Sequence, residues 1–258
     1  MSRSYTAEAI ILKKTNFDEA DKLITFLSKY KGKFTAIAKG VRKIASRRSP
    51  NLELFNKVKG HFASGRNFDV LTEVETIHTF KKIKESLEKT GAAFVLLEVT
   101  NGFLEEGQGG RLVFDLLNSF LFQMEVAKDS SSLKKTLVAY EVKFLEKVGY
   151  KPELFTCVKC KGGLVSEKLV ISPEFGGVLH SDCSENRLFT KPISGNILKV
   201  LRFFQIEEPQ KIERLRITKE LAEELEQASK FYLEYLLERE LKSSLFLKQV
   251  GEIPSLNT

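Results

Sequence analysis

The pattern of apolar and polar positions divides this sequence into two unlike parts. In residues 1–80, apolar residues partly alternate with polar ones over short runs rich in β-branched and aromatic side chains. This alternation is typical of β-strands, and turn-forming Asn, Asp, Gly, Ser and Pro residues stand between the runs. The five runs are YTAEAIIL, LITFLSK, FTAIAKG, LELFNKVKGHF and FDVLTEVETI. They predict a small closed barrel, for which the five-stranded OB-fold and an SH3-like barrel fit the pattern equally well.

From about residue 81, the apolar residues recur at steps of three and four, which is the period of an α-helix. In residues 132–150 one face is apolar, and the other is expected to face solvent. The apolar face is Leu133, Leu137, Tyr140, Phe144, Leu145 and Val148, and the polar face is Lys134, Lys135, Glu141 and Lys147. Further helices are expected within residues 90–127, after Ser194 and after Thr218, whose hydroxyls can cap a first turn. We interpret the apolar stripes as core packing, so the second part is all-α.

A short segment, residues 157–183, interrupts the helices and carries all three cysteines of the chain. Cys157 and Cys160 form C-x-x-C, and His180 and Cys183 form H-x-x-C after 19 intervening residues. Two ligands three positions apart on a turn can bind one cation, and a second such pair completes a tetrahedron. A redox C-x-x-C would open a helix after a strand, and no helical pattern follows here. The sequence therefore predicts one structural Zn²⁺ site, which would stabilise a segment with little core of its own.

The positive charge of the chain is concentrated in its first third. Residues 1–80 contain 15 Lys and Arg against 8 Asp and Glu, a difference that equals the net charge of +7 of the whole chain. Residues 29–48 include eight basic residues and no acidic one, which is typical of a surface that binds a polyanion. The candidate DNA contacts are Lys29, Lys31, Lys33, Lys39, Arg42, Lys43, Arg47 and Arg48, with Tyr30 and Phe34 as rings that could stack on bases. Either ring could instead belong to the barrel core.

Signatures of catalysis are missing from the sequence. The segment GQGGR at 107–111 lacks the lysine of a phosphate-binding loop, and no nucleophile motif surrounds His61 or His78. The acidic stretch NFDEAD could hold a divalent ion for a nuclease, but such carboxylates more often stabilise a turn. We therefore expect no enzyme. The first residues do not fit a secretory signal, no run approaches the roughly 20 apolar residues that span a bilayer, and three cysteines favour a reducing cytoplasm.

Three passages resemble the RecO family of bacterial recombination mediators. EAIILKKTNFDEADKLITFLSKYKGKFTAIAKGVRK resembles the opening of that family, FLEKVGYKPELFTCVKC its junction between helix and zinc knuckle, and RELKSSLFL its C-terminal signature. The resemblance covers nearly the whole chain in the same order. It implies an α+β multi-domain protein with an OB-fold β-barrel at 1–80, a helical domain at 81–154 and 191–258, and a zinc-binding insertion at 155–190. His180 departs from the family, whose zinc-bearing members usually have cysteine there, but Cys₃His is an established zinc set.

The resemblance also implies a function. It indicates a non-enzymatic protein of the cytoplasm and nucleoid that binds single- and double-stranded DNA and anneals complementary strands in recombinational DNA repair. With the partner RecR, such proteins help to load RecA onto DNA coated by single-strand-binding protein, and they contact the acidic, apolar C-terminal tail of that protein. The residues alone leave two alternatives open: a zinc-containing scaffold whose basic barrel meets an acidic protein tail, and an RNA-binding OB-fold protein.

Overall fold

The alternating runs of residues 1–80 form five strands that close into a barrel. The computed structural model describes residues 4–44, 46–165, 168–184 and 189–252, and every structural statement below concerns these residues. The strands are β1 (Ser4–Phe17), β2 (Asp21–Ser28), β3 (Gly32–Ala38), β4 (Lys57–Ala63) and β5 (Asp69–His78), in the order β1-β2-β3-β5-β4. All neighbours are antiparallel except β3 and β5, which pair in parallel at two positions only. The prediction of an OB-fold barrel is confirmed, and its interior is filled by apolar side chains such as Phe26 and Phe62.

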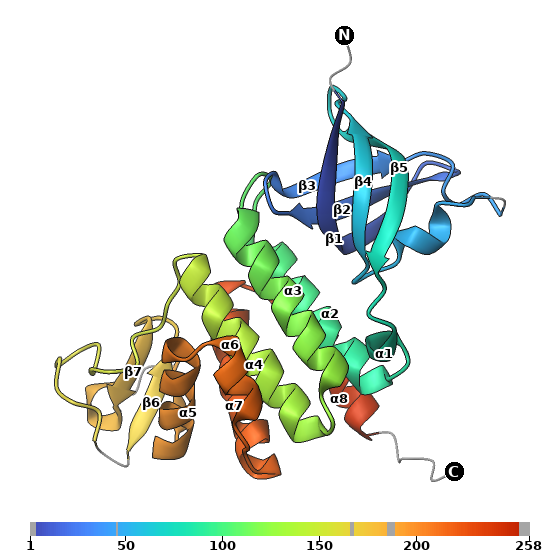
Figure 1. Cartoon of the computed structure of the whole chain (residues 1–258). Coiled ribbons are helices and arrows are strands. Elements are labelled where there is room, and N and C mark those ends of the chain that lie inside the picture. Colours follow the sequence, from blue (N-terminus) through green and yellow to red (C-terminus); the bar gives the residue numbers. More distant parts are fainter. Residues whose placement is uncertain (1–3, 45, 166–167, 185–188, 253–258) are drawn as a thin grey trace, which may run out of the picture.

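The helical part contains the helices that the periodicity predicted and several shorter ones. They are α1 (Lys81–Lys84), α2 (Leu87–Phe103), α3 (Gly110–Val126), α4 (Ser130–Lys147), α5 (Gly195–Ile206), α6 (Pro209–Arg214), α7 (Lys219–Leu236) and α8 (Lys242–Glu252). The predicted caps of α5 and α7 are confirmed, because the hydroxyls of Ser194 and Thr218 accept hydrogen bonds from the backbone N–H groups of Ile197 and Leu221. In Figure 1 the barrel lies at one end of the molecule, and the helices follow it. None of these helices is both long and apolar enough to cross a membrane.

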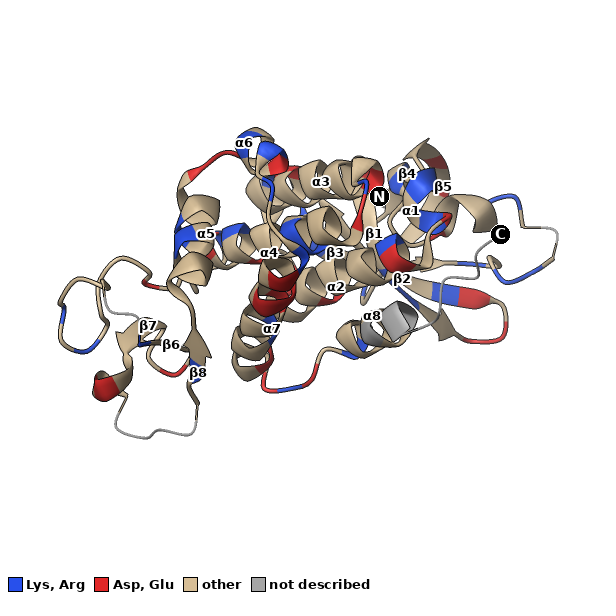
Figure 2. Ribbon diagram, turned by 90° about the horizontal axis from the view of Figure 1, so that it is seen from below, with Lys and Arg blue, Asp and Glu red and all other residues tan. Residues whose placement is uncertain are grey.

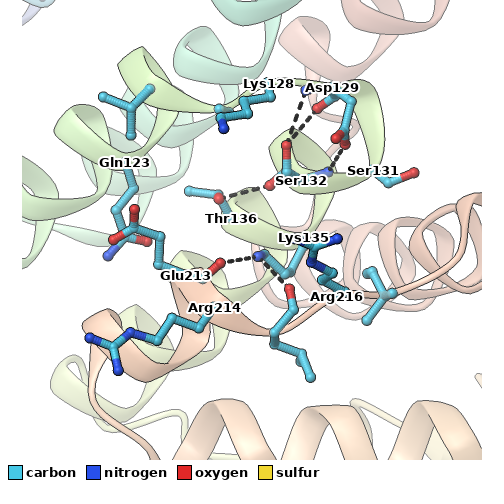
Figure 3. A pocket seen from close by; sticks show the side chains of 14 residues that line it. Gln123, Lys128, Asp129, Ser131, Ser132, Lys135, Thr136, Glu213, Arg214 and Arg216 are labelled. Carbon is cyan, nitrogen blue, oxygen red and sulfur yellow. Dashed lines mark hydrogen bonds between the residues drawn. The ribbon is translucent and has the colours of Figure 1, made fainter.

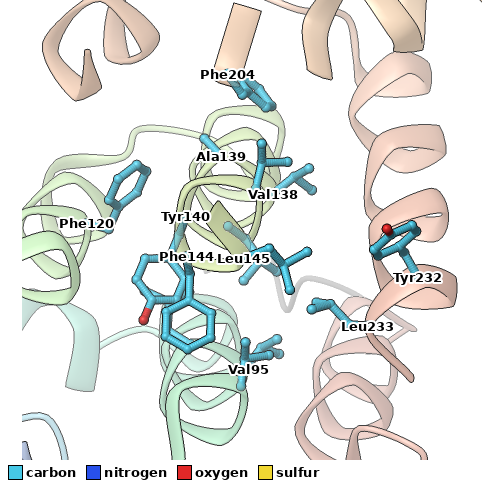
Figure 4. Packing of buried hydrophobic residues seen from close by; sticks show 14 of the residues in the cluster. Val95, Phe120, Val138, Ala139, Tyr140, Phe144, Leu145, Phe204, Tyr232 and Leu233 are labelled. Atoms are coloured by element: carbon cyan, nitrogen blue, oxygen red, sulfur yellow. The ribbon is translucent and has the colours of Figure 1, made fainter. Parts of the chain in front are cut away.

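Helix α4 lies at the centre of the helical body, and this position overturns part of the sequence prediction. Figure 4 shows Val138, Ala139 and Tyr140 on different sides of α4, and all three are buried. Lys135 and Glu141, which were expected to face solvent, are buried instead. The Lys135 ammonium donates to the backbone oxygens of Glu213 at 2.8 Å and Leu215 at 2.7 Å, and Glu141 accepts a hydrogen bond from Ser229. The prediction failed because the partners of these two polar groups come from α6, α7 and their connection, far along the chain.

The insertion folds as a small sheet at the other end of the molecule (Figure 1). Its strands are β6 (Leu169–Ser172), β7 (Gly177–His180) and β8 (Lys191–Ile193), in the order β7-β6-β8. The apolar side chains of these strands belong to the same buried cluster as the helical body. Arg202 and Gln205 of α5 donate hydrogen bonds of 2.7 Å to the backbone oxygens of Leu154 and Pro152, respectively. The insertion therefore has little core of its own, as expected, and shares the core of the helices.

The barrel is joined to the helices by a contact that we call the clasp, formed by Gly32 and Lys33 of β3 and by Gly107 and Gln108 between α2 and α3. The N–H of Lys33 donates to the oxygen of Gln108, and the N–H of Gly107 donates to the oxygen of Lys33, both at 2.7 Å. Gly32 has a φ of +69°, and a Cβ placed on it would lie 2.3 Å from the Gln108 oxygen. Only glycine satisfies both the backbone angle and the close approach.

The burial of Glu141 makes stability depend on pH. Burial raises the pKa of this carboxyl to about 8, the hydrogen bond from Ser229 opposes the rise, and the nearby Glu226 adds to it. Between the ordinary value of 4.5 and 8, the folded protein therefore holds a proton that the unfolded chain has released. The stabilising contribution is complete below pH 4.5 and is lost as pH rises through 8, because ionisation would leave a buried charge.

We expect Glu141→Gln to retain the hydrogen bond from Ser229 and to remove this pH dependence. The slope of the unfolding free energy between pH 5 and 8 should become less negative by up to ~1.4 kcal/mol per pH unit, and the variant should exceed the wild type in stability near pH 8. Urea unfolding at several pH values measures both quantities. Glu224→Gln, on the exposed side of α7, is the matched control and should leave the slope unchanged. Parallel curves for Glu141→Gln and the wild type would contradict the assignment.

Candidate nucleic-acid interface and metal centre

The basic run of residues 29–48 covers the β2–β3 turn, strand β3 and the loop that follows it. The loop extends from Lys39 to Arg48 and leads into a short 3₁₀ helix, Ser49–Leu52. The structure separates the eight predicted cations into a group held by the protein and a group that faces solvent.

Lys33 and Arg48 hold the fold together. The ammonium of Lys33 donates to the backbone oxygens of Asn101 and Leu104 at the end of α2, and its burial there lowers its pKa. The guanidinium of Arg48 donates to the backbone oxygens of Lys39 at 2.6 Å and Leu71 at 3.0 Å. Arg48 therefore fastens the end of the loop to its beginning and to β5. Both side chains use most of their N–H groups on backbone oxygens and are weaker candidates for phosphate contact.

Lys31 forms an ion pair with Asp69 and also donates to the hydroxyl of Tyr5, at 2.7 Å. Its ammonium lies 4.4 Å from the centre of the Tyr5 ring, which is a favourable cation–π contact. Desolvation acts to raise the pKa of Asp69, but the hydrogen bonds from Lys31 and Tyr5 outweigh it and lower this pKa. Lys31 is therefore neutralised within the protein.

Lys29 points toward the helices rather than toward the loop. Its ammonium lies 3.5 Å from a carboxylate oxygen of Asp115 on α3, and 5.3 Å from the centre of the Phe114 ring. Because Lys29 lies close to a carboxylate, it is a weaker candidate for DNA contact than the exposed cations of the loop.

The remaining four cations, Lys39, Arg42, Lys43 and Arg47, are exposed along the loop between β3 and the 3₁₀ helix. We call them the loop cations. Arg42 donates to the backbone oxygen of Asp18 at 3.0 Å, which ties the loop to the β1–β2 turn while keeping its charge. Within the described residues, no carboxylate forms an ion pair with any of the four. Figure 2 shows Lys and Arg positions along this projecting loop.

The two predicted rings occupy opposite environments. Phe34 is buried in the barrel, where its ring centre lies 5.2 Å from that of Phe26 and 5.0 Å from that of Phe62. It cannot stack on a base, so the structure decides this alternative in favour of the core. Tyr30, at the β2–β3 turn, is 91% exposed and is available for contact.

A pocket that the sequence pattern did not locate lies between the α3–α4 connection and the α6–α7 connection. It has a volume of about 680 Å³ and an apolar wall formed by Val126, Ala127, Leu215 and Ile217. Lys128, Arg214 and Arg216 stand at its edge, and Figure 3 shows that they come from both sides. The buried oxygen Oε1 of Gln123 has no hydrogen-bond partner among the described residues. No sequence signal joins these segments, because they are about 90 residues apart.

The four predicted metal ligands converge at the tip of the insertion. The ligand atoms of Cys157, Cys160, His180 and Cys183 all lie within 4.8 Å of one another. Nδ1 of His180 is 3.5 Å from the sulfur of Cys160 and 4.0 Å from that of Cys183. Nε2 of the same ring lies 3.1 Å from the backbone oxygen of Gly163, so an N–H there fixes the ring with Nδ1 toward the sulfurs.

The chemistry of this cluster fits a cation. Burial opposes ionisation of Cys157, but backbone N–H groups of Cys160 and His180, together with that of Lys159, outweigh it and lower the pKa of this thiol to about 6. Burial and the neighbouring sulfurs raise the pKa of Cys183 to about 11. Several thiolates at this distance repel one another unless a cation lies between them. The set can therefore bind one metal ion, with four ligands and no open position.

Comparison with known proteins finds matches to both the barrel and the helical part of the chain. Residues 1–80 match the family described as Recombination protein O N terminal, and residues 84–245 match Recombination protein O C terminal. A relative from Dehalococcoides mccartyi is 35% identical over 96% of this chain and 96% of its own length, and one from Roseiflexus sp. is 32% identical over 97% and 87%. A third, from Symbiobacterium thermophilum, is 30% identical over 94% and 96%. All three are named DNA repair protein RecO, and this chain belongs to the RecO family.

Proposed function

We propose that this protein is a recombination mediator that binds single- and double-stranded DNA and anneals complementary strands. In this proposal it acts with RecR and helps to load RecA onto DNA coated by single-strand-binding protein. The family membership and the repair function in the names of the relatives support the proposal. The activity requires no catalytic group, because annealing needs only that two strands be held while their mutual repulsion is reduced.

The observation that carries the proposal is the group of loop cations on the OB-fold barrel. Lys39, Lys43 and Arg47 make no ion pair within the described residues, and Arg42 uses one N–H on a backbone oxygen. A basic loop of this kind neutralises phosphates whatever the base sequence, since phosphate contacts carry no sequence information. Binding without sequence preference suits a protein that must pair any two complementary strands.

The Cys₃His cluster supplies the second part of the proposal, a structural Zn²⁺ ion. Three sulfurs and one imidazole nitrogen form a tetrahedral set that zinc commonly accepts in structural sites. When bound, the ion would link the turn at Cys157 and Cys160 to the end of β7. Its role would be to fix the tip of the insertion, because no ligand position remains for a substrate.

The pocket between α3, α4 and α6 supplies the third part, a seat for the tail of single-strand-binding protein. The lining has an apolar wall and four cations, with Lys135 as the fourth, against the two carboxylates of Asp129 and Glu213, and this excess of positive charge is complementary to a peptide that is both acidic and apolar. The partner would then bind on the helical body while DNA binds on the barrel.

We expect replacement of all four loop cations by alanine to weaken binding of single-stranded DNA strongly while leaving the fold intact. The logarithm of the wild-type association constant should fall with the logarithm of salt concentration with a slope of about −3, as about four neutralised phosphates require, and the variant should lose most of this slope. Fluorescence anisotropy with labelled oligonucleotides measures both. The matched control removes four exposed cations of the helical body, Lys147, Lys199, Lys211 and Lys219.

Three outcomes bear on the alternatives. A wild-type slope near zero, or equal losses in the loop variant and the control, would contradict the assignment of the loop. A clear preference for RNA over DNA would favour an RNA-binding protein, and competition by an acidic peptide but not by oligonucleotides would favour a scaffold. Annealing of complementary oligonucleotides, with and without single-strand-binding protein, then tests the mediator activity directly.

We expect the purified protein to contain about one zinc ion per chain, and we expect Cys160→Ser and Cys183→Ser to lose it. Both variants should unfold at lower temperature, because they lose the binding energy of an ion that binds only the folded protein. Metal analysis and thermal unfolding measure these effects, and Ser181→Ala, next to His180, is the control. DNA affinity should be unchanged, since the barrel lies at the opposite end of the molecule (Figure 1). Wild-type protein that carries no metal and gains no stability from added Zn²⁺ would contradict the site.

We expect charge reversal of Arg214 and Arg216 to lower the affinity for an acidic, apolar peptide by roughly tenfold or more. Both side chains are exposed at the edge of the pocket, so the fold should tolerate the change. Lys135 is left in place because it holds the backbone of residues 213–215. Titration with a fluorescent peptide measures the affinity, with a scrambled peptide and the variant Lys219→Glu/Lys230→Glu as controls. Equal losses in both variants would place the peptide elsewhere.

A further inference from the structure

An exposed pair of aromatic rings lies on the barrel, outside the basic run. Phe17 is the last residue of β1, and Phe68 stands directly before β5. Their ring centres are 6.5 Å apart, and the ring planes meet edge to face at 69°. Phe17 is 40% exposed and Phe68 37%, although large aromatic side chains are usually buried. The two residues are 51 positions apart, so the fold alone brings them together.

The strand register places this pair on the outer face of the barrel. Thr15 pairs with Leu23, Leu23 with Ile37, and Ile37 with Val70. Since side chains alternate along a strand, these residues and Phe17 face outward, opposite to the buried side chains of the barrel core. The half-buried Leu23, Ile37 and Val70 therefore form an apolar floor on the same face as Phe17. In an OB-fold, oligonucleotides bind across strands 2 and 3 and between the loops that follow strands 1 and 4.

Cations without carboxylate partners surround this face. Lys13 is exposed on β1 and, by the same alternation, shares the face of Phe17; Arg66 is exposed two residues before Phe68. Lys39 ends the neighbouring strand β3, and Arg42 is tied to the turn that follows Phe17 through the oxygen of Asp18. Neither Lys13 nor Arg66 forms an ion pair within the described part of the chain. Asp69, the acid next to Phe68, is already neutralised by Lys31.

Two acidic residues lie at one end of the outer face that carries Phe17. Asp18 and Glu19 are exposed at the β1–β2 turn, and a carboxylate oxygen of Asp18 accepts the N–H of Glu19. These carboxylates disfavour a phosphate at the very tip of the turn. A bound strand is therefore expected to cross the barrel on the side of Lys13 and Lys39.

We propose that Phe17 and Phe68 form a stacking platform for unpaired bases of single-stranded DNA, with Lys13, Lys39, Arg42 and Arg66 on the phosphates. The ligand must be anionic and must also present flat apolar surfaces, and single-stranded nucleic acid has both properties. Duplex DNA presents the same phosphates but keeps its bases stacked inside, so it gains nothing from the rings. This inference rests on the proposed function and adds to it a means of distinguishing single strands from duplex.

The chain contains no tryptophan, which makes a direct test possible. Phe68→Trp introduces a single tryptophan whose fluorescence a stacked base should quench. We expect quenching when a single-stranded oligonucleotide is added, and little or none with a duplex or with an abasic oligonucleotide of the same length. Tyr30→Trp, at the turn between β2 and β3, is the comparison for a ring that is exposed but outside the platform.

Affinity measurements provide a second, independent test. Phe17→Ala and Phe68→Ala should each weaken binding of single-stranded DNA by roughly 5- to 150-fold, with the salt slope unchanged, because stacking is lost and phosphate contacts are kept. Duplex affinity and the melting temperature should change little, since both side chains are exposed. Phe68→Tyr should restore binding, whereas Phe68→Leu, which is apolar but not flat, should not.

The outcomes separate this inference from the proposed function. Full binding by the alanine variants, or binding without quenching in Phe68→Trp, would overturn the stacking platform. The role proposed for the loop cations would not be affected. Loss of wild-type DNA binding altogether would overturn the proposed function itself. Quenching by an acidic peptide but not by DNA would overturn the platform by assigning the rings to a protein partner.

Discussion

The clasp between β3 and the α2–α3 connection is the contact on which the arrangement of the molecule depends. Because β5 pairs with β3 at only two positions, the first half of the β3 edge would be left open. Residues 107 and 108 occupy that edge with two backbone hydrogen bonds, and Lys33 adds bonds to the end of α2. The same contact thus completes the barrel and sets its orientation on the helices. A side chain at position 32 would separate the two parts, since there is no room for a Cβ.

This arrangement also decides which cations are available to a ligand. The basic residues of 29–48 look equivalent in the sequence, but five of the eight contact carbonyl or carboxylate oxygens of the protein itself. Those nearest to the helices, Lys29 and Lys33, contribute to the junction, and Lys31 compensates Asp69 inside the fold. Only the loop beyond β3 projects far enough from the clasp to keep its charges for solvent. The exposed positive charges of this loop therefore lie on the part of the barrel that faces away from the helical body.

The sequence was sufficient wherever the deciding interactions are local. Alternation located the five strands, hydroxyl caps located the starts of α5 and α7, and the spacing of Cys157, Cys160, His180 and Cys183 located the metal centre. The sequence was insufficient where the interaction partner of a side chain lies far away along the chain. Glu141 is buried because Ser229 lies opposite, 88 residues later, and nothing in the α4 pattern indicates this. Phe34 and Phe17 are both aromatic residues of barrel strands, and only the closed barrel shows which one is inside.

The buried Lys135 has a consequence for the pocket beside α6. Its two hydrogen bonds hold the oxygens of Glu213 and Leu215, and hence the backbone that carries Arg214 and Arg216, in the absence of any ligand. The wall of the cavity is thus preorganised. A peptide that enters the cavity has to lose its own conformational freedom, but the wall does not have to be ordered as well. A peptide bound there as proposed would meet a preformed wall, so its binding should need little rearrangement of the helices.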